Sequence, residues 1–346
     1  MDSQIITQTL TSYNPGKLFS YFLHRHLKFD ECRRVANYLL QGSRSVNLPD
    51  VQNLLDSLDL NKQINNLDNL KKFTNNFKNW LNQGSNRIDG LDNFEADFSA
   101  GTTQAFDSFY FRHSEKRFRC LVGEYFYHLK SWNSKPCNWS FVSDSDPLRE
   151  GDVFVLSLPF CDTGNLINDY HLLLEKCDDL NIPVLIDCCY YTIAGNVNIN
   201  VNYDCIDTVC FSLSKAFPVA HLRIGVRYTK SKIYDGQKLH HSINYNNVLS
   251  AYIGCAITDN YPADYVFNKF KDQQIEICDF FNLEPSQSVN FAIGDSTWHH
   301  YSRKNLLNAY GLTFDSTLFK NRISLNVMYE NWSTFQLFKN EYRNIF

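Results

Sequence analysis

The chain has 346 residues, of which 44% are hydrophobic and 15% aromatic, and its formal net charge is −4. This length exceeds the needs of one small core, so we expect two domains, and the hydrophobic content is too high for a largely disordered protein. Basic residues are interspersed with acidic ones and no apolar run is long enough to cross a bilayer, which argues against nucleic-acid binding and membrane spanning.

The cysteines suggest a cytoplasmic protein. There are 11 of them, and they are scattered along the chain apart from the adjacent pair Cys188 and Cys189. No Cys-x-x-Cys pair and no Cys/His spacing matches a zinc site, so we expect no metal, and free thiols that act as small apolar residues in a reducing compartment. The N-terminus also lacks the charged and then apolar pattern of an export signal.

The first part of the chain has the apolar periodicity of helices. Helical spacing covers residues 16–42, and a short helix is expected within 51–60. The clearest amphipathic helix is 67–81, in which Leu and Phe recur at steps of three and four before Gly84 ends it.

From about residue 95 the chain alternates between strands and helices. Runs such as Val153–Leu156 and Val184–Ile186 are apolar throughout, without the alternation of a sheet that faces water. Such strands are typical of a mostly parallel sheet with helices on both faces, which is a three-layer αβα domain of the α/β class. The expected strands are 94–99, 119–123, 152–158, 182–186, 208–211 and 225–228, and the expected helices are 100–111, 125–132 and 165–177.

The C-terminal part mixes both kinds of element. A loop is expected at 259–264 and a long helix at 266–281. The runs 289–292 and 323–327 have the composition of strands in a smaller second sheet. The expected domains are a large one over 45–245 and a smaller α+β one over 1–44 and 246–346, with a helical arm at its N-terminal end.

The run Ser212-Leu213-Ser214-Lys215, followed eight residues later by Arg223, is the most informative feature of the chain. A lysine amine can form a Schiff base with an aldehyde, and hydroxyls with a guanidinium can hold a phosphate. Upstream, an apolar strand ends at Asp187. A buried carboxylate beside a pyridine nitrogen keeps that nitrogen protonated, which makes the ring an electron sink. This combination indicates pyridoxal 5′-phosphate (PLP) as the cofactor.

Further residues fit the same cofactor. Gly101-Thr102-Thr103 lies between a strand and a helix, where backbone N–H groups and the helix dipole favour a phosphate. Tyr190 can hydrogen-bond the ring oxygen, although Tyr191 competes for this role, and Tyr127 is the candidate for stacking on the ring. Arg322, before an apolar strand, suggests a site for a substrate carboxylate. Core packing is the alternative for the tyrosines, and a surface salt bridge for the arginine.

These motifs resemble the class I/II aminotransferase superfamily of fold type I PLP enzymes, around aspartate and histidinol-phosphate aminotransferases. The run 212–225 is similar to the lysine motif of that family almost throughout, and the resemblance covers about residues 65–330. It implies that Lys215 is the Schiff-base lysine and proton shuttle, and that Asp187 and Tyr190 contact the ring. It also implies a homodimer, and phosphate contacts from Gly101, Thr102, Thr103, Ser212, Ser214 and Arg223.

Three departures from the family pattern bear on the chemistry. Cys161 stands where an asparagine usually bonds the ring oxygen, and because a thiol is a poor donor, the tuning of the cofactor would differ. His221 replaces a usual glycine before the phosphate arginine, either as an extra contact in the site or as a tolerated loop side chain. Residues 1–50 match nothing in the family, where this region often helps to close the site.

The expected function is therefore a PLP-dependent enzyme that acts on an amino acid or primary amine. An aminotransferase is the first choice, with Arg322 orienting the substrate carboxylate. Decarboxylases, lyases and cyclases share this apparatus and remain open, as does a role in a specialised biosynthetic pathway. A non-catalytic protein of the same fold is a remoter alternative, because such a protein has little reason to retain Lys215, Asp187 and Arg223 together.

Overall fold

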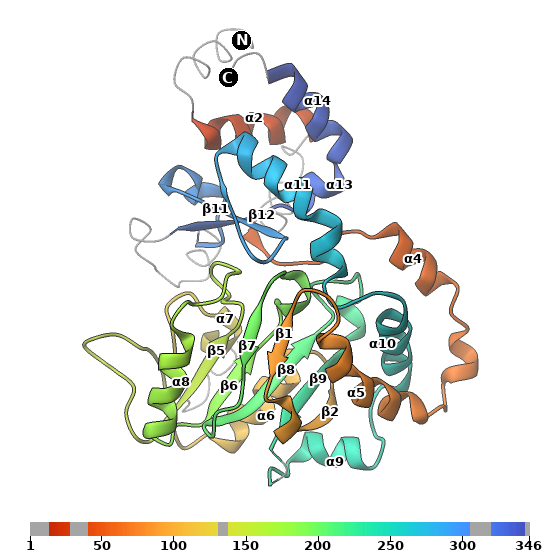
Figure 1. Cartoon of the computed structure of the whole chain (residues 1–346), viewed down its shortest axis with the longest axis vertical. Coiled ribbons are helices and arrows are strands. Elements are labelled where there is room, and N and C mark those ends of the chain that lie inside the picture. The colour runs from red at the N-terminus through yellow and green to blue at the C-terminus, as the bar shows by residue number, and fades with distance from the viewer. Residues whose placement is uncertain (1–13, 28–40, 131–137, 231, 305–319, 343–346) are drawn as a thin grey trace. The chain divides into compact units, whose positions relative to one another are not determined.

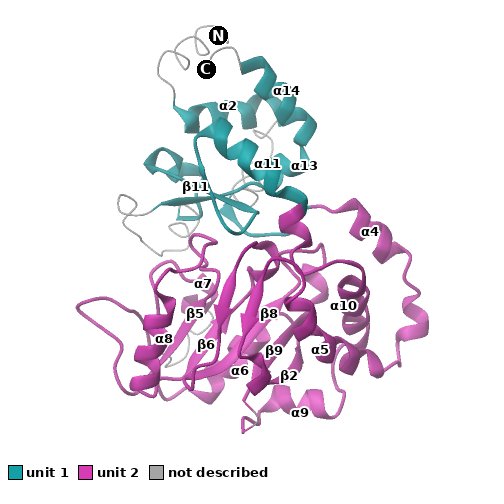
Figure 2. Ribbon diagram, in the orientation of Figure 1, with its two compact units in different colours: residues 1–46, 269–346 teal, residues 47–268 magenta. Residues whose placement is uncertain are grey.

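The computed structural model describes residues 14–27, 41–130, 138–230, 232–304 and 320–342. The chain forms two compact units, coloured separately in Figure 2. Unit 2 comprises residues 47–268, and unit 1 combines residues 1–46 with 269–346. Unit 2 therefore continues past residue 245, where the sequence suggested a domain boundary, through the helix α10 (Val248–Asn260).

Unit 2 is built around a seven-stranded sheet with the strand order β2-β9-β8-β6-β5-β3-β4. All neighbouring strands from β8 to β4 are parallel, whereas β9 is antiparallel to both β2 and β8. The expected α/β class with a mostly parallel sheet is confirmed. The strands are β2 (Glu95–Ser99), β3 (Arg117–Cys120), β4 (Asn138–Phe141), β5 (Asp152–Ser157), β6 (Val184–Asp187), β8 (Ile206–Ser212) and β9 (Gly225–Thr229).

Helices cover both faces of this sheet (Figure 1). Cys210 and Phe211 are consecutive on β8 and so point to opposite faces. Cys210 belongs to a buried cluster with Phe106 and Phe109 of α6 (Thr102–Arg112), while Phe211 contacts Phe77 of α5 (Asp68–Leu81), with ring centroids 6.0 Å apart. Because both faces are covered, β5 and β6 are buried at every position, which explains their unbroken apolar runs.

The outer layers contain helices that the sequence did not indicate. α10 packs on α5 so closely that a Cβ on Gly254 would lie 2.6 Å from the ring of Phe73. Because α10 is buried along much of its surface, it lacks the polar stripe of an amphipathic helix. The other elements of unit 2 are α4 (Pro49–Asp56), α7 (Phe126–Lys130), α8 (Tyr170–Asp179), α9 (Gly236–Ser242) and the parallel pair β1 (Arg87–Asp89) and β7 (Asn198–Asn200).

Unit 1 contains a small antiparallel sheet with the order β10-β11-β12. Helices beside it share an aromatic core in which the rings of Phe22 and Phe338 lie 4.9 Å apart. The run 323–327, expected to be one strand, divides between β12 and α13. Of the stretch 16–42, for which helix was expected, residues 28–40 lie outside the described residues. The elements are α2 (Pro15–His26), α11 (Tyr265–Phe281, which begins in unit 2), β10 (Glu284–Pro285), β11 (Phe291–Gly294), β12 (Asn321–Ser324), α13 (Asn326–Glu330) and α14 (Trp332–Tyr342).

Candidate active site

Polar side chains end three neighbouring strands of the unit 2 sheet. Ser157 ends β5, Asp187 ends β6 and Ser212 ends β8. Ser157 is the register partner of Asp187, which is also paired with Cys210. Since register partners on adjacent strands point to the same face, Ser157 and Asp187 leave the sheet on the side that α6 covers. Open α/β sheets bind their ligands just outside the carboxyl ends of such strands.

Asp187 is a buried carboxyl group with a perturbed pKa. It is 4% exposed, and its Oδ1 accepts a hydrogen bond of 3.0 Å from the N–H of Cys189. Burial and the nearby Glu124 carboxylate raise the pKa of Asp187 to about 7, while the Cys189 N–H and the Lys215 ammonium oppose the shift. Asp187 and Lys215 therefore lie within electrostatic reach of each other, in a kind of environment that is typical of functional sites.

Lys215 lies in the turn that follows β8, where it is half-buried. The preceding serines, by contrast, are buried, and their hydroxyls are bonded to each other. Ser212 Oγ and Ser214 Oγ are 2.8 Å apart, and the Ser214 N–H donates to Ser212 Oγ at 3.2 Å. The run thus places two buried hydroxyls, bonded to each other, just before Lys215 in the chain.

Arg223 contacts the turn that opens α6. Its Nη2 donates a hydrogen bond of 2.9 Å to Thr103 Oγ1, and its backbone has a left-handed φ of 54°. Gly101 must be glycine here for two reasons. Its own φ is 72°, and a Cβ would lie 2.3 Å from Nη2 of Arg223.

The strand order explains why these turns meet. Gly225 of β9 is paired with Ser99 of β2 on one side and with Ser212 of β8 on the other. The turn after β2 and the turn after β8 therefore flank Arg223, which lies two residues before the start of β9. The N-terminal end of α6, two hydroxyls and a guanidinium converge from three segments, and together they form a set of donors suited to a phosphate.

Tyr190 and Cys161 form a buried pair near Asp187. Cys161 Sγ lies 3.7 Å from Tyr190 Oη, and the two side chains are 5% and 7% exposed. Tyr191, the alternative to Tyr190, instead donates its hydroxyl to the carbonyl of Leu81 at 3.1 Å. Tyr191 is thus engaged in the core, which favours Tyr190 over Tyr191 as the tyrosine of the site.

Tyr125 and Tyr127 stack on each other, and Tyr125 interacts electrostatically with groups of the site. The hydroxyl of Tyr127 donates to the carboxylate of Asp107 at 3.1 Å. The rings of Tyr125 and Tyr127 stack with centroids 6.0 Å apart and planes at 13°. Burial raises the pKa of Tyr125, Cys189, Cys161 and Asp187 raise it further, and Arg223 opposes the shift. Tyr125 is thus within electrostatic reach of the groups around Lys215.

Arg322 belongs to unit 1, where it is 3% exposed on β12. Its guanidinium carbon lies 4.2 Å from the centroid of the Phe291 ring, and its Nη2 lies 3.5 Å from the carbonyl of Gln41. Arg322 is therefore not a surface ion-pair residue, and its assignment to a substrate carboxylate stays a prediction. His221 is exposed, which favours the tolerated loop side chain.

Sequence reasoning did not single out Ser157, Glu124 or Tyr125. Ser157 could have been identified from its position at the end of an apolar strand, because open α/β sheets bind their ligands just outside the carboxyl ends of the strands. Nothing in the run Glu124-Tyr125-Phe126-Tyr127 tells which aromatic ring turns inward, because that depends on how the short helix α7 sits on the sheet.

The described residues contain neither a candidate metal site nor a candidate membrane-spanning helix. Within the described ranges, no group of three or more His, Cys, Asp or Glu is placed to hold a metal ion. No helix in the same residues is both long and apolar enough to span a membrane.

Comparison with known proteins shows similarity at the level of the fold. No family model and no curated sequence matches the chain. Among solved structures, it is similar to a PLP-bound C–S lyase from Staphylococcus hominis, with a TM-score of 0.64 and 12% identity over 94% of this chain and 98% of that one. For N-succinyldiaminopimelate aminotransferase from Mycobacterium tuberculosis, the TM-score is 0.63 and the identity 11%, over 92% of this chain and 98% of that one. For histidinol-phosphate aminotransferase from Clostridium acetobutylicum, the TM-score is 0.57 and the identity 14%, over 88% of this chain and 98% of that one. The chain has the fold of fold type I PLP enzymes.

Proposed function

We propose that this protein is a PLP-dependent enzyme acting on an amino acid or primary amine, and that its reaction is transamination. The observation that carries the proposal is the convergence of Lys215, Asp187 and Arg223 at the carboxyl ends of β6 and β8, in a fold shared with PLP-bound enzymes. Transamination is favoured because several of the similar solved structures are aminotransferases.

The residues present fit the cofactor. Gly101 leaves room for Arg223 beside the N-terminal end of α6, which is the arrangement that a phosphate needs. Asp187 is a buried carboxyl group that would pair with a cationic ring nitrogen, and Tyr190, beside Cys161, would contact the ring oxygen. Tyr125 is the preferred stacking ring, with Tyr127 behind it. The phosphate donors are Gly101, Thr102, Thr103, Ser212, Ser214 and Arg223.

The chain's own groups have distinct tasks in this reaction. PLP supplies an electron sink for the charge that develops at the substrate α-carbon. Lys215 provides the amine that holds the cofactor and, once freed, acts as general base and acid at that carbon. Asp187 keeps the ring-nitrogen proton in place by charge pairing. Arg322 is assigned to the substrate carboxylate, as a bidentate donor.

A lyase is the second candidate, because the similar structures include a PLP-bound C–S lyase that covers 94% of this chain. The same lysine and carboxylate would serve elimination, since removal of the α-proton begins both reactions. Decarboxylation and cyclisation require the same groups. A non-catalytic protein of this fold would not need Lys215.

The covalent attachment provides the first test. Protein purified with PLP should absorb visible light, and reduction with borohydride should add a pyridoxyl group to Lys215, which mass spectrometry of peptides can locate. Lys215→Ala should lose this label and all turnover while still folding, as its circular dichroism spectrum would show. The exposed Lys176, replaced by alanine, is the matched control. Colourless protein that PLP does not restore would refute the proposal.

The reaction type needs a second measurement. Wild-type protein is incubated with a panel of amino acids, including cysteine-type thioethers, and the products are identified. Conversion of the cofactor to its pyridoxamine form with release of an oxo acid supports transamination. Released ammonia with a cleaved carbon–sulfur bond would instead establish the lyase, and released carbon dioxide the decarboxylase.

The choice between the two tyrosines can be tested by affinity. Tyr125→Ala should weaken PLP binding by about tenfold, because a stacked aromatic pair contributes on the order of 1 kcal/mol beyond its buried area. Tyr127→Ala should change the affinity by less than about twofold. Equilibrium dialysis of both variants against the wild type gives the comparison. A larger loss for Tyr127→Ala would return the stacking role to Tyr127.

A further inference from the structure

Glu124 is a buried carboxylate that the proposed chemistry does not use. It lies just beyond β3 and is 3% exposed. Its Oε1 accepts a hydrogen bond of 2.6 Å from the Ser157 N–H, and its Oε2 accepts from the Ser157 hydroxyl and, at 3.2 Å, from the Tyr125 N–H. Three donors directed at one carboxyl group favour its ionised form.

The sheet places this carboxylate beside Asp187. Ser157, which holds Glu124 by both its backbone and its hydroxyl, is the register partner of Asp187 on the adjacent parallel strand. Partners on adjacent strands are about 4.8 Å apart and point to the same face. The Leu158 N–H also donates to the carbonyl of Asp187 at 3.0 Å, which ties the two strand ends together. Glu124 and Asp187 therefore flank Ser157 at one end of the site.

A buried carboxyl group near a second one is unfavourable, because burial raises the cost of the second charge and like charges repel. Among the described residues, the groups that interact electrostatically with Asp187 include the Glu124 carboxylate, the Lys215 ammonium and several thiols and phenols, namely Cys188, Cys189, Cys210, Tyr110 and Tyr125. A carboxamide at position 124 could still accept the Ser157 N–H. The retained charge points to a role beyond holding the β5 end.

We propose that Glu124 is a positioning residue of this site, an inference that rests on the proposed function. Its carboxylate places a second negative charge at the end of the site that receives the cationic ring nitrogen. Through its bond to the Tyr125 N–H, it also sets the backbone of the ring-stacking tyrosine. Glu124 thereby couples the charge partner of the cofactor to the aromatic residue that covers it.

The test uses Glu124→Gln, which keeps the shape and removes the charge. The first readout is a carbon-13 NMR titration of the aspartate carboxyl groups in cofactor-free protein, with the Asp187 signal assigned by its loss in Asp187→Asn. In the wild type this signal should titrate near pH 7, and in Glu124→Gln about one pH unit lower. Glu115→Gln, on an exposed carboxylate, should leave the titration unchanged.

The second readout is the affinity for 4′-deoxypyridoxine 5′-phosphate, which lacks the aldehyde and so cannot react with Lys215. At about pH 8.5, where Asp187 is expected to be ionised in both proteins, Glu124→Gln should bind the analogue about tenfold more weakly than the wild type. Equal affinity of the two proteins for the analogue would overturn the inference, and so would equal titration of Asp187 in both. A wild-type Asp187 that titrates near its ordinary pKa would also overturn it, even if Glu124→Gln failed to fold.

These outcomes separate the inference from the proposed function. If the wild type does not bind the analogue, the PLP proposal fails, while the titration still reports whether Glu124 acts on Asp187. If the wild type and Glu124→Gln bind it equally well, the PLP proposal stands and the role of Glu124 is refuted.

Discussion

At the scale of single residues, the site depends on carboxyl groups that the fold buries. Asp187 ends a fully buried strand, so its charge has little water to stabilise it. Glu124 adds to this cost, and Lys215 offsets part of it. A buried carboxyl group with a pKa near 7 loses its proton in the range where the proposed cofactor ring would have to stay protonated. The charge of Asp187 therefore lowers the stability of the cofactor-free protein.

This cost leads to a prediction for Asp187→Asn. The folded-state pKa of Asp187 is about 7, above its unfolded value, so the folded protein holds the proton longer. Its contribution to stability therefore falls as pH rises from about 4 to about 7 and stays low above that. In the cofactor-free protein, Asp187→Asn should be more stable than the wild type at pH 8, by on the order of 3 kcal/mol, and equally stable near pH 4.

Urea unfolding at several pH values would measure this difference, with activity lost in the variant at every pH. The wild type itself supplies the control, since its stability should decline over the same interval. If the two proteins differed by the same free energy at pH 4 and pH 8, Asp187 would not titrate in this range and the explanation would be wrong.

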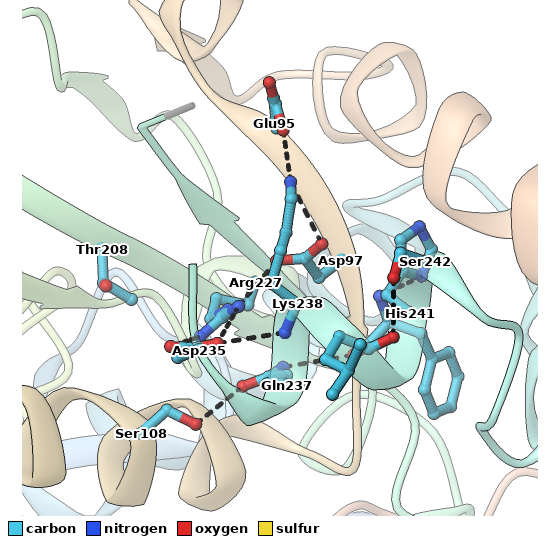
Figure 3. A network of polar contacts seen from close by, with 12 residues as sticks. Glu95, Asp97, Ser108, Thr208, Arg227, Asp235, Gln237, Lys238, His241 and Ser242 are labelled. Carbon is cyan, nitrogen blue, oxygen red and sulfur yellow. Dashed lines mark hydrogen bonds and ion pairs between the residues drawn. The ribbon is translucent and has the colours of Figure 1, made fainter. Parts of the chain in front are cut away.

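At the scale of elements, β9 follows the turn that holds Arg223 and contributes the central residue of a buried ion-pair network, which Figure 3 shows. Arg227 of β9 is fully buried between Asp97, its register partner on β2, and Asp235, with N···O distances of 2.7 Å to each. Lys238 approaches Asp97 at 3.5 Å, and Gln237 donates to the carbonyl of Phe98. The network holds β2 against β9, and their alignment sets Gly101 beside Arg223.

Removing the central cation of this network should be costly. Arg227→Met leaves two carboxylates without their main partner, and breaking a buried ion pair from one side costs about 3–5 kcal/mol. We also expect weaker binding of phosphate-bearing ligands, because the turns after β2 and before β9 would shift. Urea unfolding and PLP titration check both effects. Arg149→Met, on an exposed arginine, should change stability by less than about 0.5 kcal/mol.

Element prediction succeeded where local pattern and tertiary burial agree. The Leu and Phe spacing at 67–81 gave α5, whose apolar face covers the sheet, and the unbroken apolar runs gave β5 and β6. It missed α10, since a helix buried on several sides has no periodic polar face. It also extended a strand over 323–327, because an apolar run of that length does not reveal that Asn326 begins α13.

At the scale of the whole molecule, we predict that the protein is a homodimer. The resemblance to class I/II aminotransferases implies one, and large apolar side chains on and after α9 are exposed, namely Leu239, Ile243 and Tyr245. Light scattering coupled to size exclusion should give twice the chain mass of 40.3 kDa. A concentration-independent mass of one chain would contradict the prediction, and would require each chain to complete its own site.

The order of residues alone predicted the chemistry proposed for this protein. Lys215, Arg223 and Asp187 could be proposed as site residues because a covalent amine, a phosphate donor and a ring partner each require a particular side chain at a short spacing from a strand. Only the tertiary structure decided which neighbours complete the site. Glu124, Tyr125 and Ser157 join it because strand order and register bring distant turns together, and that pairing arises from sheet packing that no local pattern encodes.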